Sequence, residues 1–237
     1  MNSVIDFHSH VLPGMDDGSA SVEESVSMLR MEKQQGIECV IATPHFYANH
    51  DTPEQFLQRR ARAEQRLREE MAKHGDLTQL KIGAEVYFFK GISDSDVVSE
   101  LTIDSQRCIL VEMPVSPWTD SMYRELEGLY VKRGLTPVVA HIDRYISRFR
   151  TFGIPQRLGE LPVLVQANAD FFLNRATASM ALRMLKKDEI HLLGSDCHNL
   201  KSRKPNLGEA AALIEKRLGR AAIEQIKTYE REILAEV

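Results

Sequence analysis

The feature that most constrains the fold of this 237-residue chain is a series of seven short apolar runs along its length. Each run is continuous in valine, isoleucine and leucine, which is typical of parallel strands buried on both faces. The runs begin at Val4 (VIDFH), Glu38 (ECVIAT), Leu80 (LKIGAEV), Cys108 (CILVEM), Thr136 (TPVVAH), Pro162 (PVLVQAN) and Ile190 (IHLLGS). We therefore expect a parallel sheet at the centre of the molecule.

Stretches with helical character separate most of these runs. Ser21 and Glu24 have the spacing of a capping box at the start of the first stretch. Strands that alternate with helices form right-handed βαβ units, so the pattern predicts the α/β class. The predicted helices cover residues 21–35, 53–74, 120–133, 175–187, 207–218 and 220–235.

The polar residues that close the runs favour one α/β architecture. If they all lie at the carboxyl ends of the strands, a barrel fits best, because the active sites of such barrels lie on that face. Seven runs predict a distorted (β/α)7 TIM-like barrel, with an open doubly wound sheet as the alternative. No repeat, low-complexity tract or linker divides the sequence, so we expect one domain over residues 1–237.

Histidine and carboxylate side chains close nearly every apolar run. Imidazole and carboxylate together suit divalent manganese, iron and zinc. Unpaired carboxylates at the mouth of a core are costly unless a cation compensates them. The pattern therefore predicts a site for more than one metal ion. The candidate ligands are His8, His10, Asp16 or Asp17, His45, Glu85, Glu112, His141, Asp196 and His198.

Composition excludes several classes of protein. A net charge of −4 argues against a dedicated nucleic-acid binder, and no apolar run is long enough for a membrane helix. The first residues show no features of a signal peptide. Three dispersed cysteines fit a reducing compartment better than a disulfide framework. We expect a cytoplasmic protein without membrane insertion or nucleic-acid partners.

Several motifs together resemble a known family. IDFHSHVLPGMDDGS, TPH, GAE, VEMP, HIDRY and SDCHNLKSRKPNLG occur in this order and resemble the PHP (polymerase and histidinol phosphatase) superfamily. Within it they are most similar to the manganese-dependent tyrosine phosphatases of bacterial capsule and exopolysaccharide operons. The resemblance implies a distorted (β/α)7 barrel with two or three divalent ions, manganese first and iron or zinc as alternatives. The implied ligands are His8, His10, Asp17, His45, Glu85, Glu112, His141, Asp196 and His198.

The resemblance also implies catalytic residues and a substrate. Arg144 and Arg203 would hold the phosphoryl group, for which the planar and always charged guanidinium is suited. His45 is the best candidate for the general acid wherever it is not held by metal. The implied substrate is a phosphotyrosine protein, in particular the tyrosine-rich tail of a capsule-operon kinase. Phe46 and Tyr47 stand where relatives often have basic residues, which leaves the substrate contacts of that loop open.

Other functions compete with this hypothesis. The nearest is a small-molecule phosphatase of the same superfamily, such as histidinol-phosphate phosphatase. A phosphodiesterase or nuclease is disfavoured by the acidic net charge, and a non-catalytic regulatory module by the full set of ligands. Cys197 and Arg203 have the C-x5-R spacing of cysteine-based phosphatases. The intervening residues contain no glycine to cradle phosphate, so we expect this spacing to be coincidental.

Overall fold

The computed structural model describes residues 4–149 and 153–234, and the ends of the predicted unit, 1–3 and 235–237, lie outside this part. All strands in these ranges pair in parallel. Every predicted apolar run contains a strand, and the run from Leu80 contains two. The strands are β1 (Asp6–Ser9), β2 (Cys39–Ala42), β3 (His45–Phe46), β4 (Gln79–Ile82), β5 (Glu85–Tyr87), β6 (Cys108–Glu112), β7 (Thr136–Val139), β8 (Leu164–Asn168) and β9 (Leu192–Gly194).

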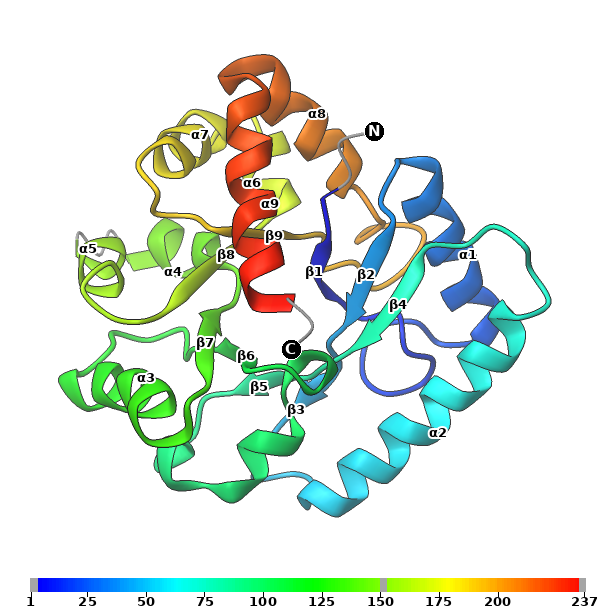
Figure 1. The fold of residues 1–237 in the computed structure, drawn as a ribbon, viewed down its shortest axis with the longest axis horizontal. Coiled ribbons are helices and arrows are strands. Elements are labelled where there is room, and N and C mark those ends of the chain that lie inside the picture. Colours follow the sequence, from blue (N-terminus) through cyan, green and yellow to red (C-terminus); the bar gives the residue numbers. More distant parts are fainter. Residues whose placement is uncertain (1–3, 150–152, 235–237) are drawn as a thin grey trace.

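The strands form two hydrogen-bonded sheets that curl together. The smaller sheet has the order β1-β2-β4 and the larger has the order β3-β5-β6-β7-β8-β9. β3 follows β2 after Thr43 and Pro44, and β5 follows β4 after Gly83 and Ala84, so each sheet continues into the other. β9 at the far edge returns to β1, where Asp196 N donates to His8 O (2.8 Å). The result is a curled parallel sheet surrounded by helices (Figure 1).

Most of the helices begin and end close to their predicted positions. Three short helices, α4, α5 and α6, were not predicted, and three 3-10 turns between residues 92 and 105 replace an α-helix between β5 and β6. None of the described helices is long and apolar enough to cross a membrane. The α-helices are α1 (Val22–Gln34), α2 (Pro53–Met71), α3 (Asp120–Arg133), α4 (Ile142–Phe149), α5 (Ile154–Leu158), α6 (Ala169–Leu173), α7 (Ala178–Lys186), α8 (Leu207–Leu218) and α9 (Arg220–Leu234).

Local sequence explains where the longer helices start and stop. The Ser21 side chain accepts from Glu24 N (3.2 Å) as the predicted capping box requires, but Glu24 Oε2 accepts from Ala20 N (2.9 Å) instead of Ser21 N, so only half of the box forms. Thr52 and Gln55 form a complete capping box at α2. Gly134 ends α3 with φ 65°, a conformation that glycine adopts without steric cost.

Two hydrophobic clusters lie on the two sides of the curled sheet. The larger one packs the outer face against the surrounding helices. The smaller one lies inside the curl, with side chains of α9 such as Ile233 packed against it, and α9 crosses in front of the strands in Figure 1. Full burial of a large apolar side chain stabilises the folded state by about 1.5–3 kcal/mol relative to leaving the side chain exposed. The inner cluster consists of Phe7, Ile41, Ile103, Cys108, Leu110, Val138, Ala140 and Leu192.

The inward-facing side chains of β6 and β8 change from apolar to polar toward the carboxyl end of the strand. On β6 the inward sequence is Cys108, Leu110 and then Glu112, because side chains repeat every two residues. On β8 Leu164 is followed by Gln166 and Asn168. The carboxyl ends of these two strands therefore present polar groups next to the apolar inner cluster.

Candidate metal centre

All nine predicted ligands converge at the carboxyl ends of the strands. They come from β1 and the loop after it, the starts of β3 and β5, the end of β6, and the segments that follow β7 and β9. Within each of four overlapping groups, the donor atoms all lie within 4.8 Å of one another. The groups are His8, His10 and Asp196; His8, Glu85 and His141; His45, Glu85 and Glu112; and His10, Asp17, His45 and His198.

Glu85 lies at the middle of the cluster and is 1% exposed. Its Oε2 is 3.1 Å from His8 Nε2, 3.3 Å from His10 Nε2 and 3.0 Å from His45 Nδ1. Its Oε1 is 2.8 Å from His141 Nε2. Burial alone would raise the pKa of Glu85, but the surrounding imidazoles, His8 foremost, hold it well below its ordinary value. The carboxylate is therefore ionised and directed at four imidazoles.

His8 and His10 present their Nε2 atoms to the centre. His8 Nδ1 lies 3.3 Å from Gln166 Oε1, and His10 Nδ1 lies 2.8 Å from Asp16 Oδ2. Because these acceptors occupy the Nδ1 atoms, the Nε2 atoms are directed inward, as in metal-binding histidines whose other nitrogen is held by a carboxylate or amide. The donor set fits divalent cations.

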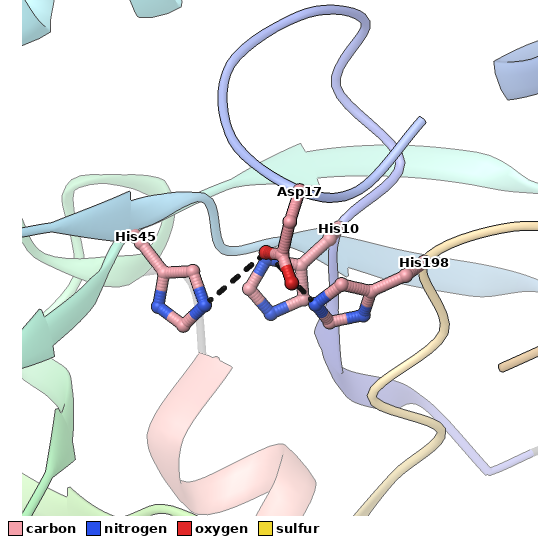
Figure 2. A group of neighbouring side chains, drawn as sticks. All are labelled: His10, Asp17, His45 and His198. Carbon is pink, nitrogen blue, oxygen red and sulfur yellow. Dashed lines mark ion pairs between the residues drawn. The ribbon is translucent and has the colours of Figure 1, made fainter. Parts of the chain in front are cut away.

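A second group of side chains surrounds Asp17, which Figure 2 shows between His45 and His198. Asp17 Oδ1 is 3.3 Å from His198 Nε2 and 3.6 Å from His45 Nε2. Burial and the neighbouring His10 lower the pKa of His198 to about 4, so this imidazole is neutral and available as a ligand. Its buried Nε2 has no hydrogen-bond partner among the described residues. Asp17, not Asp16, therefore has the geometry of a ligand.

Arg144 and Arg203 border the cluster and share one carboxylate. Arg144 Nη2 donates to Asp196 Oδ2 (2.6 Å), and Arg203 Nη2 donates to Asp196 Oδ1 (2.7 Å). Arg144 Nη1 also donates to Glu112 (3.1 Å). The two side chains are 33% and 36% exposed, whereas Asp196 is 5% exposed. The guanidiniums therefore lie between the buried ligands and solvent, where a phosphoryl group can reach them.

The backbone is constrained where it delivers the ligands. His141 and Asp196 have φ values of 33° and 53°, which few residues other than glycine adopt. Such conformations cost about 1–3 kcal/mol and occur most often at functional sites. A Cβ on Gly194 would lie 2.6 Å from the His8 Cβ, so only glycine lets β9 approach β1 this closely.

Three polar residues that sequence reasoning did not assign to the site, together with Asp16, hold the ligands in place. Gln166 accepts from His141 N (2.6 Å), and Asn168 Nδ2 donates to Asp196 Oδ2 (2.9 Å). Asp16 orients His10, and Asp6 accepts from Ser195 N (2.8 Å) and Ser195 Oγ (2.5 Å) just before Asp196. In the sequence, the two amides at the end of the run PVLVQAN are the signal that could have identified Gln166 and Asn168.

Cys197 does not face this cluster. Its side chain is fully buried on the other side of the segment, in a group with Asp6 and Glu32. Burial raises the pKa of the Cys197 thiol well above its ordinary value, and Glu32 and Asp6 raise it further. A buried thiol with a raised pKa is a poor nucleophile, which supports the expectation that the C-x5-R spacing is coincidental.

Comparisons with known proteins agree on one family. The sequence profile described as "Capsular polysaccharide synthesis, CpsB/CapC" matches residues 4–234. The tyrosine-protein phosphatase CpsB of Streptococcus pneumoniae is 28% identical over 226 residues, 91% of each chain. The tyrosine-protein phosphatase YwqE of Bacillus subtilis is 28% identical over 224 residues, 91% of this chain and 85% of YwqE.

A solved structure has the same fold. It comes from the pair YwqE of Bacillus subtilis and CpsB of Streptococcus pneumoniae, described as unique metal-dependent tyrosine phosphatases. The superposition has a TM-score of 0.82 at 25% identity and covers 96% of this chain and 93% of that one. The curled parallel sheet described above is therefore the fold of a metal-dependent phosphatase.

Proposed function

This chain belongs to the CpsB/CapC family of capsular polysaccharide synthesis proteins, and on that premise we propose that it is a metal-dependent protein-tyrosine phosphatase. The match confirms the family resemblance expected from the motifs. The observation that carries the proposal is the convergence of nine imidazole and carboxylate ligands beside two partly exposed guanidiniums. This combination of charges suits a phosphate monoester better than any neutral substrate.

The nine converging side chains are the ligands of the proposed centre, which holds two or three divalent ions. Manganese is the first choice for their mixed oxygen and nitrogen donors, with iron and zinc as alternatives. When bound, such ions supply a water with a lowered pKa and positive charge for the phosphoryl oxygens. Glu85, whose two oxygens face four imidazoles, would be among the residues that hold the ions.

Arg144 and Arg203 bind and orient the phosphoryl group. Each now donates to an oxygen of Asp196, and a phosphate offers the same kind of charged acceptor. Their positive charge offsets the negative charge that spreads over the equatorial oxygens in the transition state.

The leaving group requires little protonation. Tyrosine has an ordinary pKa near 10, so its phenolate departs more readily than an alkoxide. His45 Nδ1 lies 3.0 Å from Glu85 Oε2, and His45 Nε2 lies 3.6 Å from Asp17 Oδ1. Burial by itself lowers the pKa of His45, but the interaction with Glu85 raises it above its ordinary value. A protonated His45 is therefore the candidate to donate the proton when a metal does not hold it.

The wider proposals follow from the same hypothesis. The substrate is a phosphotyrosine protein in the cytoplasm, in particular the tail of a tyrosine kinase that controls capsule or exopolysaccharide synthesis. The fold is a distorted (β/α)7 barrel in which β2 with β3 and β4 with β5 each count as one interrupted strand. Residues 1–237 form one domain. A small-molecule phosphomonoesterase, such as histidinol-phosphate phosphatase, is the alternative.

The deciding experiment measures phosphatase turnover on a phosphotyrosine peptide after EDTA treatment, with and without added Mn²⁺. We expect activity to vanish on chelation, to return with Mn²⁺, to survive Cys197→Ser and to be lost in His141→Ala. Chelator-resistant turnover that Cys197→Ser abolishes would overturn the metal mechanism. A preference for histidinol phosphate over the peptide would favour the alternative substrate class.

A further inference from the structure

Tyr87 at the end of β5 and Tyr47 directly after β3 each lie two residues beyond a proposed ligand. β3 and β5 pair in parallel with His45 opposite Glu85. Since side chains on one face of a strand repeat every two residues, Tyr47 and Tyr87 follow these ligands on the same face and further toward the mouth. Their ring centroids are 5.5 Å apart with an interplanar angle of 42°, and the Tyr47 ring is 5.2 Å from the His45 ring.

These rings have no role in the core that would explain them. Tyr47 and Tyr87 are half-buried and belong to neither hydrophobic cluster, in contrast to Phe88 and Phe89, which pack against the larger one. Among the described residues, neither tyrosine hydroxyl forms a hydrogen bond. The pair therefore presents aromatic surface at the mouth of a strongly charged site.

The tyrosine pair stands beside the guanidinium that binds phosphate in the proposed function. Tyr87 is in register with Glu112 on β6, and Glu112 accepts from Arg144 Nη1 (3.1 Å). Neighbouring strands lie about 5 Å apart, so Tyr87 and the Arg144 guanidinium both lie next to Glu112. In an aryl phosphate, a single ester oxygen separates phosphorus from the ring. A phosphoryl group held beside the ions thus places the ring in the next layer outward, where the tyrosines lie.

We propose that Tyr47 and Tyr87 form an aromatic wall against which the phenyl ring of phosphotyrosine packs, and that this wall favours aryl over alkyl phosphate esters. The inference rests on the proposed function and names the residues that determine its specificity. Tilted and offset aromatic pairs at such distances are favourable, and each ring is expected to contribute about 2- to 10-fold in affinity. Since the ring packs in both the ground state and the transition state, the contribution appears in KM.

The test compares Tyr47→Leu and Tyr87→Leu with the wild-type protein, all loaded with Mn²⁺. The substrates are a phosphotyrosine peptide and the same peptide carrying phosphoserine. We expect each variant to raise KM for the phosphotyrosine peptide about 2- to 10-fold, with kcat unchanged and with no change for phosphoserine. Tyr47→Phe should behave as wild type because it keeps the ring, and Tyr130→Leu on α3 is the matched surface control.

The inhibition constant of inorganic phosphate, a competitive inhibitor, reports whether the phosphoryl pocket stays intact. It should be the same in the wild-type protein and the four variants. The aromatic-wall proposal would be wrong if the leucine variants raised KM equally for both peptides. It would also be wrong if they left KM for the phosphotyrosine peptide unchanged. If the wild-type protein hydrolyses neither peptide, the proposed function fails. In that case calorimetry still tests the aromatic wall, by measuring the affinities of the Mn²⁺-loaded proteins for O-phosphotyrosine and O-phosphoserine. Only the affinity for O-phosphotyrosine should weaken in the leucine variants.

Discussion

The Nε2 atoms of His8 and His10 lie 3.2 Å apart, within hydrogen-bonding distance of each other. Burial by itself lowers the pKa of His10, but its hydrogen bonds to Asp16 and Glu85 raise it to about 10. Hydrogen bonds to Glu112 and Glu85 likewise raise the pKa of His141 to about 9 against the effect of burial. Without metal, both imidazoles are therefore protonated at neutral pH, and a metal ion must displace these protons.

Metal affinity should consequently rise steeply with pH. Below about pH 9, binding at His10 and at His141, which belong to different groups of ligands, releases one proton at each, so the affinity of each position for Mn²⁺ should increase about 10-fold per pH unit. Calorimetry in buffers of different ionisation enthalpy measures the protons released. His141→Gln should reduce their number by one. An affinity that does not change between pH 7 and 8.5 would contradict the pKa values of these two histidines.

Gln166 should control metal affinity without being a ligand. Its Oε1 contacts both His8 Nδ1 (3.3 Å) and His141 N (2.6 Å), so Gln166→Leu frees two ligands to reorient. Loss of such a supporting contact typically lowers metal affinity about 10- to 100-fold. We expect activity to recover at high Mn²⁺ concentration. Gln65→Leu on the exposed face of α2 is the matched control, and equal affinities in the two variants would show that Gln166 has no orienting role.

Asp16 and Asp17 should differ in the kind of defect their loss produces. Asp16 accepts from His10 Nδ1 and from His45 N (2.9 Å), whereas Asp17 faces His45 and His198 as a proposed ligand. Asp17→Asn should lower the number of ions bound, as measured by metal analysis after gel filtration. Asp16→Asn should keep that number and weaken the affinity, because its amide still accepts from His45 N but not with full charge. The opposite result would exchange the two roles.

The sequence predicts those parts of the site that a strand period can reveal. A ligand that closes an apolar run, such as His141 at the end of TPVVAH, can be recognised because the run fixes where the strand ends. Gln166 is not visible in the same way, since its role depends on contacts with His8 and His141 that are 158 and 25 residues away. The helix α4 was missed because it begins directly at the ligand motif HIDRY, where no cap or turn residue separates it from β7.

The division of the strands into two sheets is not predicted from the sequence, because it too depends on contacts between distant segments. The run LKIGAEV is continuous in sequence, yet it forms β4 and β5, which pair with different strands. A Cβ on Gly83 would lie 3.0 Å from the Ile103 side chain, so the glycine marks a close approach between β4 and the turn at Ile103. Only the packing of a distant segment shows why the strand is interrupted there.

Glu230 should make the folded state less stable as pH rises. It is 3% exposed on α9, and its Oε1 accepts from Ile5 N (2.9 Å). Burial raises its pKa from 4.5 to about 7, although the Ile5 contact opposes the shift. Because the folded pKa lies above the unfolded one, its contribution is fully present below about pH 4.5 and is lost as pH rises through 7.

Glu230→Gln removes this dependence while keeping an oxygen that accepts from Ile5 N. A shift of this size corresponds to about 3 kcal/mol at most, so the variant should be about 1–3 kcal/mol more stable than wild type at pH 8 and equal to it at pH 4.5. Urea unfolding of the metal-free proteins at the two pH values measures the difference, and Glu224→Gln on the same helix is the exposed control. A Glu230→Gln protein whose advantage is the same at both pH values would show that the gain comes from packing and not from ionisation.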